Sequence, residues 1–196
     1  IQAAILHGIE TGQWLSGAGK RYACGGLLFT SGLKLRDISL VHNKNADLVS
    51  VLQTADTTLV SNVELENVNI DGSRETQTEI KGTTSREDGG RHCLAIRGEC
   101  ENIFIRNCTF TNSAADGLCL FPIGAAASYA VRNVVISDSV FTDNRRHGIS
   151  ADKVNGLTLV RCKLNSNGLT KTVGFPDNHG NTGDKFGGLF YGNGID

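Results

Sequence analysis

The fold is decided between Asn102 and Asp152, where one pattern occurs twice. The segment reads N-I-F-I-R-N-C-T-F-T-N (102–112) and A-D-G-L-C-L (115–120), and then N-V-V-I-S-D-S-V-F-T-D-N (133–144) and R-H-G-I-S-A-D (146–152). The first and third pieces are copies of a long unit, and the second and fourth are copies of a short unit. An internal repeat of this kind indicates a fold in which copies of one structural unit stack on each other.

The long unit has alternating apolar residues on both sides of an Asp or Asn. This alternation predicts two short strands that meet at a bend. An Asn or Gly precedes most copies, as expected for tight turns that need unusual backbone angles. The copies are Leu33–Leu40, Val63–Ile70, Ile103–Phe110, Val134–Phe141 and Leu157–Leu164, the last with Arg161 at the bend position.

The short unit is a small or polar residue, usually followed by Gly, and then a short strand of apolar residues at alternate positions. Its copies begin at Gly25, Asp47, His92, Asp116, His147 and Asn193. Three short strands per repeat predict an all-β fold, a right-handed parallel β-helix (a solenoid) whose repeats bury each other's inner faces. An antiparallel sandwich or barrel is the alternative, but it does not require the same residue type to return at the same phase of each strand pair.

The composition favours a single domain over residues 1–196. The chain has 39% hydrophobic residues, 24 Gly, 2 Pro and a net charge of −1, which suit a turn-rich β protein with no general attraction for nucleic acid. No stretch is apolar and long enough to span a membrane. Because the repeat stops in mid-strand at Asp196 without a polar cap, we expect a fragment of a longer chain.

The six cysteines form no C-x-x-C pair. We therefore predict buried thiols that pack as small hydrophobic residues, with a disulfide between neighbouring repeats left open. We expect no zinc or other metal, and no cofactor.

Three segments depart from the repeat. I-Q-A-A-I (1–5) with Ile9 predicts a short capping helix over residues 1–11, closed by Gly12. Residues 71–91 and 165–192 are polar insertions, which we expect to be loops. The second insertion carries aromatic residues, among them Tyr191, which suit either stacking on sugar rings or holding the loop against the domain.

The first residues of the short units are the candidate site. On consecutive repeats they would lie about 4.8 Å apart in one column. A column of Asp47, His92, Asp116, His147 and Asn193 pairs carboxylates with imidazoles, which suits proton transfer near neutral pH. Basic residues that could bind an acidic substrate flank it, namely Arg91, Arg145, Arg146 and Lys153. The alternative is structural, since Asp and Asn before Gly are common turn residues.

Two short motifs resemble known families. I-Q-A-A-I and the repeat resemble the pectate-lyase-like β-helix proteins, a group that includes many phage tailspikes. R-H-G-I-S (146–150) is similar to the G-H-G-I-S strand of polygalacturonase-type glycoside hydrolases, and A-D-G-L-C-L (115–120) falls where that family has D-D-C-x-A-I. The match implies Asp116 as general acid and His147 as its supporting histidine. Ala115 and His92 replace two of the family's carboxylates, so a second carboxylate has to come from elsewhere, for example Asp47 or Asp88.

The resemblance implies a polysaccharide depolymerase, a glycoside hydrolase acting on an extended acidic glycan. It also implies a homotrimer on a virion tail spike or a bacterial cell surface. A uronate lyase or epimerase, with His92 or His147 as base, is the alternative enzyme. A non-catalytic glycan-binding adhesin or a structural fibre segment are the alternatives without catalysis. For the enzyme we expect Asp116→Asn to abolish activity with little change in thermal stability.

Overall fold

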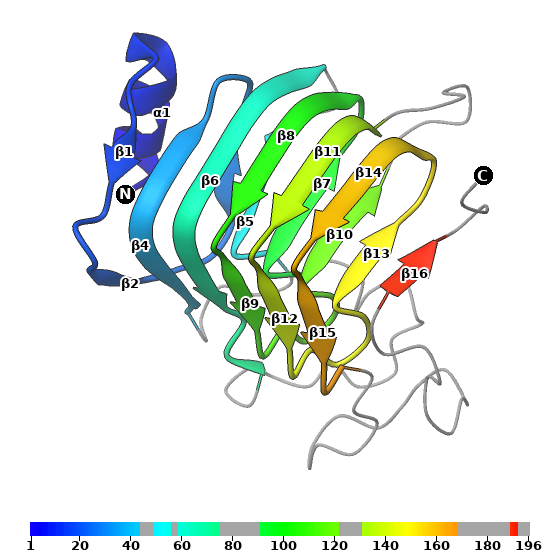
Figure 1. Cartoon of the computed structure of the whole chain (residues 1–196). Coiled ribbons are helices and arrows are strands. Elements are labelled where there is room, and N and C mark those ends of the chain that lie inside the picture. Colours follow the sequence, from blue (N-terminus) through cyan, green and yellow to red (C-terminus); the bar gives the residue numbers. More distant parts are fainter. Residues whose placement is uncertain (44–48, 56–58, 75–90, 122–130, 168–188, 192–196) are drawn as a thin grey trace.

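A computed structural model of the chain describes residues 1–43, 49–55, 59–74, 91–121, 131–167 and 189–191. In these residues the chain forms one helix, α1 (Gln2–Thr11), and sixteen short strands arranged in two curled sheets (Figure 1). Every neighbouring pair of strands in the described residues is parallel. The predicted all-β, parallel character is therefore confirmed, and the antiparallel alternative is wrong.

The larger sheet is built from the long units. Its main path runs β14-β11-β8-β6-β9-β12-β15, and β4 joins it beside β6 with β1 and β2 at its edge. The strands are β1 (Leu15–Ser16), β2 (Arg21–Cys24), β4 (Lys34–His42), β6 (Val60–Asp71), β8 (Cys100–Arg106), β9 (Thr109–Thr111), β11 (Val131–Ser137), β12 (Val140–Thr142), β14 (Val154–Val160) and β15 (Lys163–Asn165).

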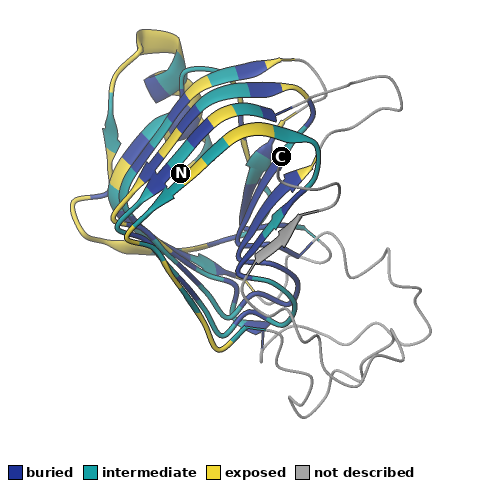
Figure 2. Ribbon diagram, turned by 45° about the vertical axis from the view of Figure 1, so that its right-hand side comes forward, coloured by how far each residue is buried: buried dark blue, intermediate teal, exposed yellow. Residues whose placement is uncertain are grey.

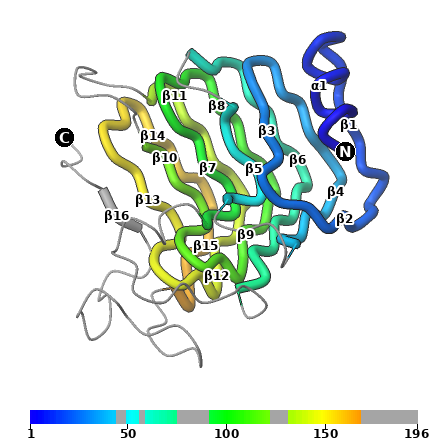
Figure 3. Tube along the Cα trace, turned by 180° about the vertical axis from the view of Figure 1, so that it is seen from behind, coloured from blue at the N-terminus to red at the C-terminus, as the bar shows by residue number. Residues whose placement is uncertain are grey.

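The smaller sheet is built from the short units, in the order β16-β13-β10-β7-β5-β3. Figure 3 shows it from behind, with α1 beside its β3 end. The strands are β3 (Leu27–Phe29), β5 (Leu52–Thr54), β7 (Leu94–Arg97), β10 (Leu118–Phe121), β13 (Ile149–Ala151) and β16 (Leu189–Tyr191).

Equivalent residues of successive repeats pair with each other. Val63 pairs with Ile103, Ile103 with Val134, and Val134 with Leu157. In the same way Phe110 pairs with Phe141, and their rings stack with centroids 4.8 Å apart. The repeat seen in the sequence is thus a repeat in space.

The bend of each long unit is a residue in the left-handed conformation. Asp37, Asn67, Asn107 and Asp138 have φ between 52° and 54°, a region that Asn and Asp tolerate better than most residues. Their side chains also join successive repeats, because the Asn107 amide donates to Asn67 Oδ1 over 2.6 Å and the Asn67 amide donates to Asp37 Oδ1 over 2.9 Å. The predicted bend is confirmed.

The core lies between the inner faces of the two sheets. Figure 2 shows buried residues alternating with more exposed ones along the strands. All six cysteines are unpaired thiols, as predicted, and four of them belong to this core. Burial raises the pKa of Cys24 to about 11 and the pKa values of Cys100 and Cys108 to about 12, so these thiols stay neutral.

Helix α1 confirms the predicted N-terminal helix. Ile5 is fully buried, and the helix ends at Gly12, whose φ of 69° suits a glycine. The Gln2 side chain pairs with the main chain of Leu28, accepting from its N–H and donating to its carbonyl, both over 2.8 Å. Since β3 is an edge strand, this side chain satisfies main-chain groups that no further strand pairs.

The structure corrects the phase of one short unit and the end of one predicted insertion. The expected strand after Asp47 forms further along, as β5, with Leu52 paired with Leu27. Residues 189–191, expected in a loop, form β16, where Leu189 pairs with Ile149. The remaining parts of the two insertions, 75–90 and 168–188, lie outside the described residues. Among the described residues no helix has the length and apolar content to cross a membrane.

Candidate functional site

The candidate site lies where the chain enters β7, β10 and β13 of the smaller sheet. Main-chain hydrogen bonds fix the stacking there: Cys93 N–H donates to the Asp116 carbonyl over 3.2 Å, and Gly117 N–H donates to the His147 carbonyl over 3.0 Å. His92, Asp116 and His147 therefore occupy one column on three successive repeats. The sequence predicted this arrangement for these three residues.

Asp116 is the centre of the column. It is fully buried, and Arg146 binds both of its oxygens, with Nε donating to Oδ1 over 3.0 Å and Nη2 donating to Oδ2 over 2.6 Å. The main-chain N–H of His147 also donates to Oδ1, over 3.2 Å. His147 Nδ1 lies 3.1 Å from Oδ1 and His92 Nδ1 lies 3.3 Å from Oδ2. One carboxylate thus contacts one guanidinium and two imidazoles.

This environment keeps Asp116 ionised. Burial opposes the charge, but Arg146, His147 and His92 outweigh it and hold the pKa of Asp116 well below its usual range. A carboxylate that is buried, ionised and bound by arginine cannot supply a proton to a leaving group. The general-acid role implied for Asp116 by the resemblance therefore does not fit the geometry, and the residue acts instead by holding its neighbours.

His92 is the buried cation of the cluster. It is 2% exposed, and its Nδ1 lies 3.3 Å both from Asp116 Oδ2 and from the main-chain nitrogen of Asp116. Burial disfavours the charged ring, but interactions with Cys119 and Asp116 prevail and raise the pKa of His92 to about 9. The raised pKa favours the charged ring near neutral pH, whereas the main-chain N–H of Asp116, which donates to Nδ1, favours the neutral ring.

His147 is the imidazole of the cluster that solvent reaches. Its side chain is 15% exposed, against 2% for His92, and that of Arg146 is 22% exposed. Contact between Nδ1 and Asp116 fixes the orientation of the ring. Among the three column residues, His147 has the placement that acid/base chemistry requires.

Buried polar residues next to the cluster hold together the segments that precede β10 and β13. Asn144 is fully buried; its Oδ1 accepts from the main-chain N–H of Ser113 over 3.1 Å, and its amide donates to the Phe110 carbonyl over 3.1 Å. A Cβ on Gly117 would lie 2.7 Å from both Asn144 Nδ2 and the Gly148 carbonyl, so only glycine fits between the repeats. The sequence analysis missed Ser113 and Asn144. These two residues occupy the same position when N-S-A-A-D-G (112–117) is aligned with D-N-R-R-H-G (143–148).

The other predicted site residues divide into two groups. Arg91 precedes His92 and is buried, 3% exposed, so it belongs to this corner. His147 precedes the N-terminal end of β13, whereas Lys153 follows its C-terminal end. Lys153 therefore does not flank the cluster. Asp47, Asn193 and the side chain of Tyr191 lie outside the described residues.

The strand register gives the column position predicted for Asp47 to another residue. Ser50 occupies it, because Ser50 precedes Leu52 as His92 precedes Leu94 and its carbonyl accepts from Gly26 N–H. The short unit predicted to begin at Asn193 lies outside the described residues. Tyr191 is part of β16 itself and not of a loop.

A metal is the obvious alternative for a cluster of this composition. His92, Asp116 and Cys119 offer one nitrogen, one oxygen and one sulfur within 4.8 Å of one another. Both oxygens of Asp116 are already bound by Arg146, however, and the guanidinium charge repels a cation at the same place. We therefore assign no metal to these residues.

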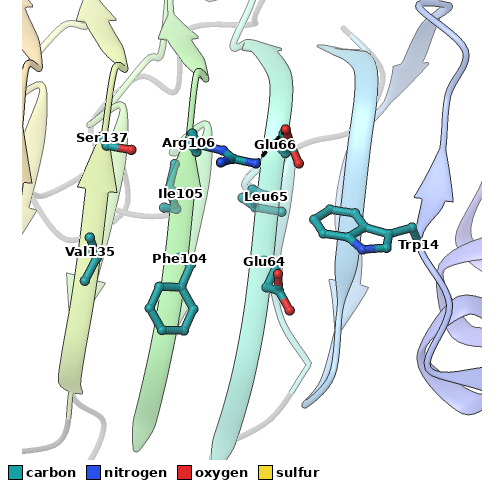
Figure 4. Close-up of a pocket in the computed structure, with 9 residues that line it drawn as sticks. All are labelled: Trp14, Glu64, Leu65, Glu66, Phe104, Ile105, Arg106, Val135 and Ser137. Carbon is teal, nitrogen blue, oxygen red and sulfur yellow. Dashed lines mark hydrogen bonds and ion pairs between the residues drawn. The ribbon is translucent and has the colours of Figure 1, made fainter.

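A second surface lies on the outer face of the larger sheet. A hollow of about 280 Å³ is lined by Trp14, Phe104 and Glu64, among other residues. Figure 4 shows Glu64 between the two aromatic rings. Phe104 is 42% exposed, and the guanidinium of Arg36 lies 5.6 Å from the centroid of the Trp14 ring. Two aromatic faces beside carboxylates form a surface on which sugar rings could stack.

Comparison of the chain with protein-family models, curated proteins and solved structures finds no match.

Proposed function

We propose that the chain is a right-handed parallel β-helix of the pectate-lyase-like type that binds an extended acidic polysaccharide and cleaves it, with His147 as the proton-transfer residue. The observation that carries the proposal is a partly exposed histidine whose Nδ1 is held, 3.1 Å away, by a buried ionised aspartate. The in-register stacking of equivalent repeat positions supports the β-helix.

An acidic substrate is favoured by the local charge. Arg91, Arg145 and Arg146 lie next to His92 and His147 in the sequence, and the Arg74 side chain donates to the Asp143 carbonyl over 2.9 Å. Among the described residues these arginines are the basic groups of this corner that could contact a polyanion, although the whole chain has a net charge of −1. A local positive field attracts a polyanion and neutralises a uronate carboxylate as charge develops on it.

Elimination fits this cluster better than hydrolysis does. His147 would take the proton from the carbon next to the uronate carboxyl group, and the electron pair left there would form a double bond as the bond to the next sugar breaks. The leaving oxygen then takes a proton from solvent. An inverting hydrolase needs a protonated carboxylic acid and a second carboxylate about 6.5–9.5 Å away, and Asp116 is ionised. We therefore place the lyase before the hydrolase, which reverses the order that the sequence motifs imply.

Glycan binding without cleavage is the second candidate, and the hollow between Trp14 and Phe104 favours it. An adhesin of this kind would retain a polymer on the outer face of the larger sheet. It would not need the cluster around Asp116.

The test is product formation from a panel of acidic capsular polysaccharides, followed by mass spectrometry and by the ultraviolet absorbance of unsaturated uronates. We expect oligosaccharides with unsaturated ends, and we expect His147→Gln to slow their release by about 100-fold or more, the usual contribution of a general base. His7→Gln, on an exposed position of α1, is the matched control and should act as wild type.

Three outcomes contradict the proposal or part of it. Wild-type turnover by His147→Gln removes His147 from the reaction. Incorporation of heavy-oxygen water without an unsaturated product means hydrolysis. Retention of a polymer with no product means the adhesin.

The resemblance also suggests a homotrimer at a phage tail spike or a bacterial cell surface. We include both in the proposal, and sedimentation equilibrium of the purified chain tests the first of them.

A further inference from the structure

The hollow on the outer face of the larger sheet extends over several strands. Trp14 directly precedes β1, and β1 pairs with β4. Lys34 of β4 pairs with Glu64 of β6, and Glu64 pairs with Phe104 of β8. Trp14 and Phe104 are therefore three strand spacings apart, about 14 Å at the main chain. This is longer than one sugar ring, so the hollow has room for consecutive rings of an oligosaccharide that lies across the strands.

Each end of the hollow has an aromatic side chain. Phe104 is exposed although β8 lies inside the sheet, between β6 and β11. The Trp14 ring lines the hollow, and its contact with the Arg36 guanidinium helps to hold the indole in place. Exposed apolar surface with a rim of polar side chains is typical of a ligand-binding groove.

The charges of the hollow favour an uncharged ligand. The charged side chains that line it are those of Glu64, Glu66 and Arg106. Arg106 Nη2 donates to Glu66 Oε1 over 2.7 Å, and Lys34 Nζ lies 3.5 Å from Glu64 Oε1. These ion pairs leave no surplus of positive charge for the carboxylate of an acidic sugar, which would also meet the two glutamates.

The same side chains can bind hydroxyl groups. Arg106 is exposed, and Glu64 and Glu66 are half-buried, so all three reach solvent. A carboxylate accepts hydrogen bonds and a guanidinium donates them, and each has more hydrogen-bonding positions than one ion pair uses. Ser137 adds a hydroxyl on β11, where it pairs with Arg106. The hollow thus combines aromatic rings with donors and acceptors that suit a polyhydroxylated ligand.

We propose that this hollow binds an uncharged oligosaccharide, which lies across the strands with one sugar ring against Trp14 and another against Phe104. The apolar C–H face of each sugar packs on an aromatic ring, and its hydroxyl groups bind Glu64, Glu66 and Arg106. The proposal rests on the glycan binding suggested above for this hollow and adds the class of sugar. It does not depend on cleavage at the charged cluster, and it gives the protein separate sites for acidic and neutral sugars on its two sheets.

The fluorescence of Trp14 reports on the hollow directly, because the chain has a single tryptophan. The experiment is titration of the native protein with neutral hexaoses of glucose, mannose and galactose, and with a hexaose of galacturonate as the acidic probe. We expect at least one neutral hexaose to shift the emission of Trp14 to shorter wavelength and to saturate. We expect the acidic hexaose to bind at least about 10-fold more weakly, a difference of about 1.4 kcal/mol.

Two variants assign the shift to the hollow. Phe104→Ala removes one of the two aromatic rings and should weaken binding of the neutral hexaose at least about 10-fold. Phe121→Ala is the matched control and should bind as wild type, because Phe121 is also an exposed phenylalanine but lies on β10 of the smaller sheet. Thermal melting checks that both variants are folded, as expected for exposed positions.

Three results would overturn the proposal: no saturable shift with any neutral hexaose, an acidic hexaose that binds as tightly as the best neutral one, or equal affinity of Phe104→Ala and wild type. The wild-type protein separates this site from the proposed cleavage. Product from an acidic polysaccharide without a Trp14 shift on neutral hexaoses contradicts the hollow alone. A Trp14 shift without product from any polysaccharide contradicts the cleavage and supports the hollow.

Discussion

At the scale of single residues, the site depends on one buried carboxylate. Asp116 is fully buried and contacts Arg146, His147 and His92. Removing a charge from such a cluster leaves the partner charges buried and uncompensated, which costs more than the lost contacts. Asp116 therefore determines the stability of this corner as well as the orientation of His147.

Asp116→Asn should lower the free energy of unfolding by about 3–5 kcal/mol. The matched control is Asp138→Asn. Asp138 is also bound by an arginine through two hydrogen bonds, of 2.6 and 2.8 Å from Arg161, but that pair is exposed. Exposed ion pairs contribute little, and Asn tolerates the positive φ of position 138. Urea unfolding of the two variants makes the comparison, and equal losses would show that the Asp116 cluster is not a buried charge network.

The sequence predicted the column of His92, Asp116 and His147, because the repeat phase places them on successive strands. It did not predict the role of Asp116 or the expected instability of Asp116→Asn. The role of Asp116 and the instability of its variant both follow from the contact between the Arg146 side chain and Asp116, which lies one repeat earlier. The phase of the repeat gives the position of a residue but not the direction of a long side chain.

At the scale of elements, the bends hold successive repeats in register. Each bend residue combines a left-handed backbone with an amide or carboxylate that bonds to the next repeat, as Asn107 does with Asn67. The sequence predicted these bends, because a small polar residue recurs at one phase. It misplaced β5, because apolar residues over 48–52 fit several phases and no Gly before them fixes one. It also missed β16, although G-G-L-F-Y (187–191) has the pattern of the short unit G-G-L-L-F (25–29).

Two substitutions at Asn107 separate the contribution of its side-chain hydrogen bond from that of its left-handed backbone conformation. Asn107→Gly keeps the backbone conformation and loses only the hydrogen bond to Asn67. Asn107→Ala loses the bond and keeps a Cβ at a φ of 52° without the polar side chain that makes Asn tolerant of this region, which costs roughly 1 kcal/mol more than Gly at the same position. Thermal melting should rank wild type above Asn107→Gly and Asn107→Gly above Asn107→Ala. A reversed order of the two variants would mean that flexibility of the unfolded chain outweighs backbone strain at this bend.

At the scale of the whole molecule, the stacking of repeats gathers charged side chains in a nearly neutral protein. The chain has a net charge of −1, yet Arg91, Arg146 and His92 are found among the described residues where β7, β10 and β13 begin. Composition alone does not predict such a cluster. Only the parallel stacking of the repeats brings His92, Asp116 and Arg146, which are far apart in sequence, into contact.

The most direct test of this buried charge cluster is the free energy of unfolding as a function of pH, for wild type and His92→Gln. Because the pKa of His92 rises from 6.5 to about 9 on folding, its contribution is complete below pH 6.5 and is lost as the pH rises through 9. We expect the stability of wild type to fall across this range and that of His92→Gln to stay nearly constant. A wild-type stability that is flat or rises between pH 6.5 and 9, or an equal fall in His92→Gln, would contradict a charged His92 on Asp116.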